Sequence, residues 1–245
     1  MASRYREFLH KCWWFCTDLS SLPTKRSASQ IGVVMSLSAE EGKQYFYPNR
    51  WARIVLESAE EIIGDKGVAA LLNLAGLPQY IGNYPPDNMK KEFSFEDMGK
   101  LQQAFWDMSG ARGARVFATR AGEKSFNDGL RSFGSVAKAA QVAMKIGSLE
   151  KRMSVGLAFF ARFFNTVSDQ VVSVDENENE WHWNIERCPM CTGRKTDSPV
   201  CHLAVGVLQG AFTWGSDGQR FRMTPVKCQG MGDEVGVINI EKKPL

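Results

Sequence analysis

The sequence has little of what several functional classes need. It contains only three histidines, and its net charge is just +3, from 30 basic and 27 acidic residues. So weak a surplus argues against nucleic acid as a partner, because nucleic-acid binding needs a clustered basic face. No run reaches the roughly 20 apolar residues that span a bilayer, and the apolar patch Cys12–Cys16 is too short for a signal peptide. We therefore expect a cytoplasmic protein without a transmembrane segment.

Motifs of catalysis are also missing. There is no Gly-x-Ser-x-Gly elbow, no phosphate-binding glycine loop and no His-Glu-x-x-His pair. With no visible nucleophile, base or redox fingerprint, a binding protein is favoured over an enzyme, which the sequence does not exclude.

What the chain does have is enough apolar material for a large core, since 44% of its 245 residues are hydrophobic and 11% are aromatic. Residues 1–30 are predicted to be an N-terminal extension, a helix followed by a serine-rich loop, and residues 31–245 a single domain. Periodicity and capping residues predict helices at Asn49–Ile63, Lys66–Ala75, Ser94–Met108, Phe126–Phe133, Ser135–Ile146 and Leu149–Val167. Asn49 is the expected N-cap of the first helix, and Ser94 that of the third.

The pattern changes after residue 170. Two strands, Gln170–Val174 and Trp181–Ile185, are predicted to form a hairpin around the acidic turn Asp175–Glu180. A helix at Pro199–Phe212 follows, then strands at Arg220–Lys227 and Val235–Lys242. Two short segments are less certain in type: Ile31–Ser36 suits a strand, and Arg115–Ala121 suits a strand or a helical turn. Helices first and strands later indicate an α+β domain.

Four of the six cysteines cluster in the last third of the chain, at Cys188, Cys191, Cys201 and Cys228. Clustered cysteines in a reducing compartment are more often metal ligands than disulfides. Four thiolates at the ends of secondary-structure elements suit one tetrahedral zinc ion with no open position, which makes the ion structural. Three alternatives stay open: reduced or partly paired cysteines, an iron–sulfur cluster, and His202 in place of one cysteine.

The residues around these cysteines resemble a known family. The motifs are Cys188-Pro-Met-Cys191, Ser198-Pro-Val-Cys201-His-Leu-Ala-Val-Gly206 and Val226-Lys-Cys228-Gln-Gly-Met-Gly232-Asp233. With weaker helical motifs, residues from about 50 to 242 are similar to the 4-vinyl reductase, or hydrocarbon-binding, domain family. That family shares its fold with small subunits of the TRAPP vesicle-tethering complex and with sensor domains of phenol-responsive bacterial regulators.

The resemblance implies helices packed on a twisted antiparallel sheet, a homodimer, and a zinc-binding part at residues 181–242. It also implies a pocket for a hydrophobic, aromatic or tetrapyrrole-like small molecule, with Trp183 at the position that often supplies an aromatic to it. An ordinary core tryptophan is the alternative for Trp183. Two positions depart from the pattern: Gly236 stands where relatives often carry a further cysteine, and Pro225 stands in the stretch where some phenol sensors carry a glutamate ligand.

Three functions follow from these features. The first is a zinc-containing small-molecule-binding protein, acting as a sensor or carrier. The second is a vinyl-reductase-type enzyme, or its accessory protein, in (bacterio)chlorophyll or tetrapyrrole metabolism, which would need a hydride donor from a partner or from a cofactor site that the sequence does not reveal. The third is a scaffold or assembly subunit.

Overall fold

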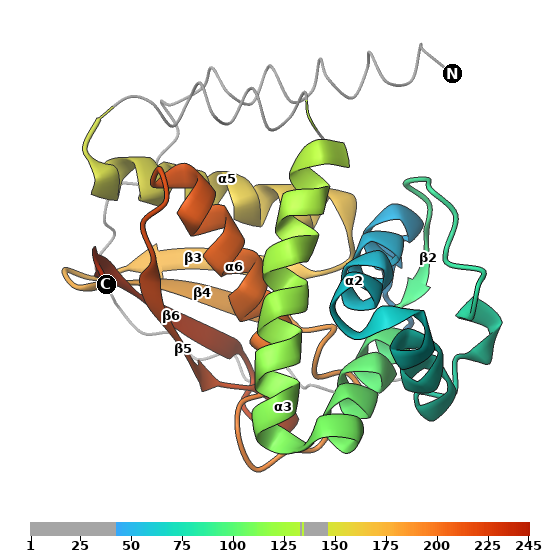
Figure 1. Ribbon diagram of the computed structural model, residues 1–245. Helices are drawn as coiled ribbons and strands as arrows, with labels where there is room; N and C mark the ends of the chain where they lie inside the picture. The colour runs from blue at the N-terminus through green and yellow to red at the C-terminus, as the bar shows by residue number, and fades with distance from the viewer. Residues whose placement is uncertain (1–42, 133, 135–146) are drawn as a thin grey trace. The chain divides into compact units, whose positions relative to one another are not determined.

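The computed structural model describes residues 43–132, 134 and 147–245. Its elements in chain order are β1 (Phe46–Pro48), α2 (Asn49–Leu74), η2 (Pro78–Tyr80), β2 (Lys91–Ser94), α3 (Phe95–Ser132), α5 (Leu149–Val167), β3 (Val171–Glu176), β4 (Glu180–Arg187), α6 (His202–Gly215), β5 (Phe221–Lys227), η3 (Gln229–Met231) and β6 (Gly236–Pro244) (Figure 1). The strands form an antiparallel pair, β1-β2, and a four-stranded antiparallel sheet of order β3-β4-β6-β5. The predicted α+β class with helices on an antiparallel sheet is confirmed.

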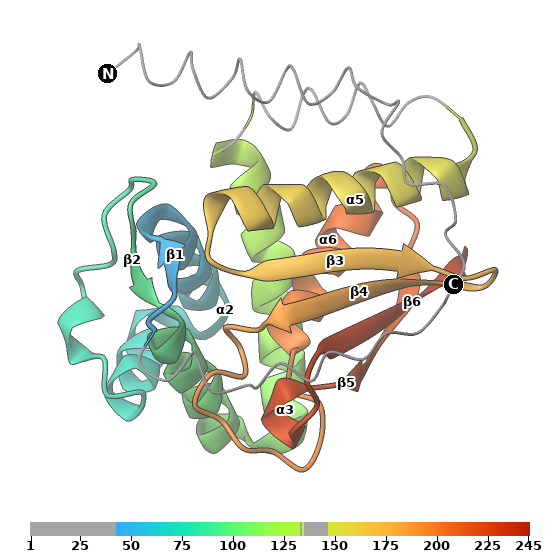
Figure 2. The ribbon, with the colours of Figure 1, turned by 180° about the vertical axis from the view of Figure 1, so that it is seen from behind.

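The two faces of the four-stranded sheet differ as a period of two residues requires. On β4, Trp181, Trp183 and Ile185 are buried, whereas His182 and Asn184 point the other way and are partly exposed. Helices α6 and α3 cover the buried face, and α5 runs beside the edge strand β3 (Figure 1). Figure 2 looks onto the opposite, polar face. The core therefore lies between the sheet and the helices.

Helices α3 and α6 cross with their backbones almost touching. A Cβ atom added at Gly206 would lie 1.9 Å from the carbonyl oxygen of Thr119, and one added at Gly122 would lie 2.2 Å from that of Leu203. Any larger residue would separate the two helices. The last glycine of the Cys201–Gly206 motif is thus a packing requirement, and it fixes where Cys201 sits relative to α3.

The helix ends predicted at Ile63 and Met108 are present as kinks inside α2 and α3, at Gly64 and Gly110, where φ is 76° and 63°. The Ser94 cap is also present, since its Oγ accepts a hydrogen bond from the backbone N–H of Asp97 at 3.0 Å. The Arg115–Ala121 segment, left open between strand and helix, is helical and belongs to α3. The prediction that Asn49 caps α2 is wrong, because Pro48 holds that position and the Asn49 amide donates instead to Glu92 at 2.6 Å.

Other boundaries differ from the prediction for identifiable reasons. The β3–β4 hairpin reaches into the acidic run, because Asp175 pairs with His182 across the strands and the side chain of Asn177 accepts the backbone N–H groups of residues 179 and 180. Helix α6 begins at His202 rather than at Pro199. The pair β1-β2 was not predicted, since strands of three and four residues carry too little pattern.

Some predictions fall on residues that the structure does not describe: the N-terminal extension, the strand Ile31–Ser36 and the helix Ser135–Ile146. Among the described helices, none combines the length and the hydropathy needed to span a bilayer.

Candidate metal centre and apolar cavity

The structure brings the four predicted cysteines together in one buried cluster, which we call the cysteine cluster: Cys188, Cys191, Cys201 and Cys228. The Sγ of Cys191 lies 3.4 Å from those of Cys188 and Cys201 and 3.3 Å from that of Cys228. The Cys201 Sγ lies 3.8 Å from that of Cys188 and 3.9 Å from that of Cys228. All four thiols are free and buried.

Four sulfurs at about 2.3 Å from a tetrahedral zinc are about 3.8 Å from one another. The distances from the Cys201 Sγ to those of Cys188 and Cys228 match this value, and the three distances from the Cys191 Sγ are shorter, at 3.3–3.4 Å. The Cys188 and Cys228 sulfurs lie farther apart, because the group whose ligand atoms all lie within 4.8 Å of one another holds Cys188, Cys191 and Cys201. A disulfide needs sulfurs about 2.0 Å apart, so the alternative of partial pairing does not describe this cluster. An iron–sulfur cluster holds its thiolates on different irons and needs wider spacing.

Three chain segments supply the thiols. Cys188 and Cys191 lie on the turn after β4, Cys201 is the N-cap of α6, and Cys228 follows β5. Two side chains in the β5–β6 connection fasten these segments to one another. Gln229 accepts the N–H of Cys188 at 2.9 Å and donates to the carbonyl of Glu186, while Asp233 accepts the N–H of Cys228 at 2.8 Å. The thiols are therefore placed by a hydrogen-bonded frame.

The four thiols are buried close together, so the ionisation of one thiol changes the pKa of its neighbours. Hydrogen bonds from Cys191 and Cys201 hold the pKa of the Cys188 thiol well below its usual value, despite burial. Hydrogen bonds with Cys188, Cys191 and Cys228 raise the pKa of the Cys201 thiol. A cation among the sulfurs would favour the thiolate forms.

One cation of the protein itself stands beside the cluster. Arg194 is only 9% exposed. Its guanidinium donates to Gln103 and to the carbonyl of Met190, both at 3.1 Å. Burial lowers the pKa of Arg194, whereas the four cysteines act in the opposite direction. A four-thiolate site with a divalent ion carries two negative charges, and Arg194 offsets part of them.

His202, the alternative ligand, is not in the group of close ligand atoms. That group holds cysteine sulfurs only, within the residues that the structure describes. Burial first, and then Arg115 and Arg194, lower the pKa of His202 to about 4. The ring is a neutral neighbour of the cluster, and the mutually close ligand atoms are those of Cys188, Cys191 and Cys201.

Next to the cluster lies a small cavity of about 20 Å³. Its lining is apolar apart from two side chains, and comes from β1, α2, α5, β4 and α6 and from the turns beside them: Tyr47, Trp51, Phe160, Phe164, Gln170, Trp183, Met190, Leu203, Ala204, Val207 and Leu208. Trp183, the predicted pocket residue, is among them. It packs on Phe160 and Phe164, with ring centroids 5.8 Å and 6.2 Å away.

The cavity and the cysteine cluster share their walls. Met190, which lines the cavity, sits between Cys188 and Cys191, and Leu203 and Ala204 follow Cys201 on α6. Cys188 also contributes to the raised pKa of Tyr47, after burial. Contacts that hold the four sulfurs in place therefore also hold the side of the cavity that Met190, Leu203 and Ala204 line.

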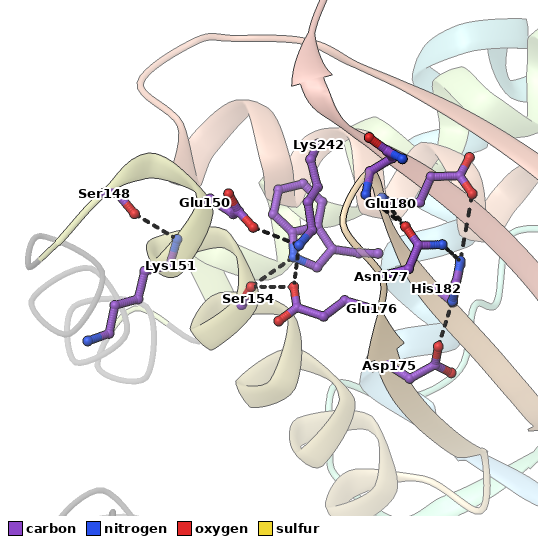
Figure 3. Close-up of polar contacts among 12 residues, drawn as sticks. Ser148, Glu150, Lys151, Ser154, Asp175, Glu176, Asn177, Glu180, His182 and Lys242 are labelled. Atoms are coloured by element: carbon purple, nitrogen blue, oxygen red, sulfur yellow. Dashed lines mark hydrogen bonds and ion pairs between the residues drawn. The ribbon is translucent and has the colours of Figure 1, made fainter. Parts of the chain in front are cut away.

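Another part of the cavity lining is the α5 wall, formed by Phe160 and Phe164. Near the start of α5, Lys242 of β6 binds Glu150 of α5 at 2.6 Å and Glu176 of β3 at 3.0 Å. Ser154 of α5 accepts the indole N–H of Trp181 and donates to Glu176. Figure 3 shows these side chains converging between helix and sheet. A small polar network thus holds α5 on the sheet.

A second polar group lies on the other face of the same hairpin (Figure 3). His182 Nδ1 is 2.5 Å from Asp175, and the Asn184 amide donates to Asp175 at 2.6 Å. Although burial alone would raise the pKa of Asp175, these two hydrogen bonds lower it. The group braces the two strands and stands apart from the cavity.

A larger hollow of about 560 Å³ opens on α2, near its kink. Charged side chains line much of it, among them Arg53, Glu60 and Lys66, and Glu60 accepts a hydrogen bond from Tyr84 there. It shares no residue with the cysteine cluster, and its charges do not suit an apolar ligand.

The fold and site define an α+β domain in which a four-cysteine cluster abuts an aromatic cavity. The V4R domain family model matches residues 181–242, from β4 through the cysteine motifs and α6 to β6. The resemblance that the cysteine motifs predicted is confirmed for this stretch. A search of curated proteins finds no match.

Solved structures share the fold over most of the chain. A point variant of "Tt H-NOX" has a TM-score of 0.51 and 9% identity, covering 81% of this chain and 96% of its own. A structure described as "Modulating Heme Redox Potential Through Protein-Induced Porphyrin Distortion" has a TM-score of 0.50 and 8% identity, covering 79% and 98%. At such identities the likeness concerns the fold alone.

Haem does not fit the cavity described here. A porphyrin needs a pocket in the range of about 300–1,000 Å³, whereas this cavity measures about 20 Å³. Its lining has no histidine or cysteine. Tyr47 and Met190 are residue types that can ligate haem iron, but a cavity of about 20 Å³ has no room for the macrocycle.

Sequence reasoning missed several residues of the site. Gln229 and Asp233 stand inside a quoted motif, so their position next to Cys228 was a usable signal. Arg194 follows Cys191 by three residues, but Arg187 and Lys195 stand in the same stretch, so the sequence alone did not single it out. Tyr47 and Gln170 are 123 residues apart and carry no local pattern that would pair them.

Proposed function

We propose that this protein is a zinc-containing module that binds a hydrophobic small molecule and acts as a sensor or carrier. One observation supports this proposal most strongly: the cysteine cluster and the aromatic cavity share a wall. Met190, on the turn that holds Cys188 and Cys191, and Leu203, on the helix that follows Cys201, both line the cavity. The match to the V4R domain and the fold shared with H-NOX structures support a small-molecule-binding role.

In this proposal Cys188, Cys191, Cys201 and Cys228 hold one zinc ion per chain. Zinc prefers four tetrahedral ligands and thiolates, and the five sulfur–sulfur distances of 3.3–3.9 Å support such a site. The ion has no position left for a substrate, so it clamps the β4 turn, α6 and the β5–β6 turn together. Free thiols of this kind persist in a reducing compartment, which keeps the cytoplasm as the proposed location.

The ligand in this proposal is a compact aromatic or hydrocarbon molecule. An apolar cavity of about 150 Å³ accepts benzene, so the cavity must widen from about 20 Å³ before a ligand enters. In this proposal the α5 wall moves to widen the cavity, and the apolar face of α5, with Met153, Leu157, Ala161 and Phe164, shifts with it. A tetrapyrrole would require a far larger displacement.

Native mass spectrometry of the purified protein, followed by titration with a panel of monocyclic aromatics, tests the binding role. Ala204→Phe fills the cavity from α6 and should abolish binding, while Ala158→Phe, on the exposed side of α5, should not. Trp51 and Trp183 give a fluorescence readout from within the lining. Equal binding by both variants, or no binding by any compound, would refute the proposal.

The resemblance also predicts a homodimer, which we carry forward as part of the proposal. Light scattering during size-exclusion chromatography measures it directly. A monomeric mass at micromolar concentration would remove the dimer without affecting the ligand or the metal.

A further inference from the structure

The cavity lining has one polar element, a hydrogen-bonded pair formed by Tyr47 and Gln170. Both residues are 3% exposed. The Tyr47 hydroxyl donates to Gln170 Oε1 at 2.5 Å. Such a distance falls within the range of O–H···O bonds and below that of N–H···O bonds. The oxygen of the amide therefore faces the tyrosine, and its nitrogen faces elsewhere.

The amide nitrogen of Gln170 is a donor without a protein partner. The backbone N–H of Gln170 donates to Ser168 Oγ at 3.1 Å, and its Oε1 accepts from the Tyr47 hydroxyl. Among the residues that the structure describes, no acceptor lies within hydrogen-bond distance of Nε2. Nε2 is not among the fully enclosed side-chain atoms of the described residues that lack a partner, so it borders open space, and the open space that Gln170 lines is the cavity. An acceptor atom in the cavity would pair with this donor.

Gln170 is also held in place before any ligand arrives. Ser168, which accepts its N–H, donates in turn to the carbonyl of Phe164 at the end of α5. The tyrosine fixes the amide plane from the other side. A donor fixed in this way loses little freedom when it binds, which favours selectivity as well as affinity.

We infer that Gln170 anchors the ligand through an acceptor oxygen, and that the ligand class is a neutral aromatic compound carrying one carbonyl or ether oxygen. This inference rests on the proposed function and deepens it. The remaining lining is apolar and holds no cation, so an ionised carboxylate or phenolate would be buried without a counter-charge. A single water is the rival occupant, since about 20 Å³ holds one.

The test uses two probes of nearly the same shape, acetophenone and α-methylstyrene, in which a carbonyl oxygen is exchanged for a methylene group. Isothermal titration compares the full-length protein with Gln170→Leu and, should that variant misfold, with Gln170→Met. We expect each variant to weaken acetophenone binding about tenfold, the loss of one buried hydrogen bond. Binding of α-methylstyrene should change less than about twofold, because it never used the amide.

An infrared readout on the unmodified protein needs no variant. The carbonyl stretch of bound acetophenone should fall below its value in hydrocarbon solvent if the amide donates to it. Equal effects of the substitutions on both probes, an unshifted stretch, or a water retained at Gln170 in a ligand-bound crystal structure would overturn the anchor while leaving the binding role standing. Failure of both probes to bind would overturn the anchor and the proposed function together.

Discussion

The cysteine cluster and the α5 wall enclose the same cavity by different means. At the cluster, three chain segments converge on four sulfurs, Gln229 and Asp233 tie their backbones together, and α6 lies against α3 with no side chain between. At the α5 wall, Phe160 and Phe164 of α5 pack on Trp183 of the sheet, and a partly exposed polar network joins the start of the helix to the strands. We propose that the cluster side stays fixed and that the α5 side moves when a ligand enters. A domain made this way can admit a ligand without losing its frame.

The largest effect should come from breaking the fixed side. Cys228→Ser removes one thiolate from the proposed zinc site, and we expect loss of the metal together with more than about 4 kcal/mol of stability. Urea unfolding and metal analysis of the same sample measure both. Cys12→Ser is the matched control and should change neither. A stable, metal-bound Cys228→Ser protein would contradict the clamp.

A smaller loss is expected where α6 meets α3. Gly206→Ala puts a Cβ 1.9 Å from the Thr119 carbonyl oxygen, and the forced separation should cost about 3 kcal/mol. Gly129→Ala on α3 is the control, since its Cβ would make only an ordinary 3.5 Å contact with Trp51 and should stabilise the helix by about 0.5–1 kcal/mol. The midpoints of denaturant unfolding measure the stability of both variants. Equal shifts of the midpoint in Gly206→Ala and Gly129→Ala would argue against the close crossing of α3 and α6.

On the movable side, Lys242→Met removes the cation that joins α5 to the sheet. Its partners Glu150 and Glu176 are 58% and 45% exposed, so we expect a loss of only about 1 kcal/mol. Hydrogen exchange of the α5 amides should rise while exchange in α6 stays unchanged. Arg222→Met, which breaks the exposed pair with Glu241, should leave α5 exchange as it was. Faster exchange throughout the domain would mean that α5 is no separate unit.

The smallest effect concerns Asp175, which lies on the outer face of the hairpin. Its pKa is lower in the folded protein than the usual value near 3.9. The stability it contributes is therefore present above that pH and is lost as the pH falls through the folded pKa. Asp175→Asn should cost less than about 1 kcal/mol at pH 7 and nothing near pH 2. Glu178→Gln, in the exposed turn, is the control for removing one negative charge. A difference that persists at low pH would rule out the proposed linkage.

Local chemistry made the fixed side predictable from sequence. The cysteine spacing, the glycine kinks at Gly64 and Gly110, the Ser94 cap and the alternation in β4 are each written in neighbouring residues. Family resemblance added Trp183 and the match over 181–242. The movable side and the polar pair were not predictable in this way, because Tyr47 meets Gln170 and Lys242 meets Glu150 only through tertiary packing. The short strands β1 and β2 were not predicted for a related reason, because their pairing with each other, and not the propensity of their residues, defines them.

X-ray absorption at the zinc edge reports directly on a zinc ion in the cysteine cluster. We expect one zinc per chain, surrounded by four sulfurs at about 2.3 Å, with the signal lost in Cys228→Ser and kept in Cys12→Ser. Metal-free protein of full stability, a nitrogen or oxygen ligand bound to the ion, or iron with metal–metal scattering would contradict it.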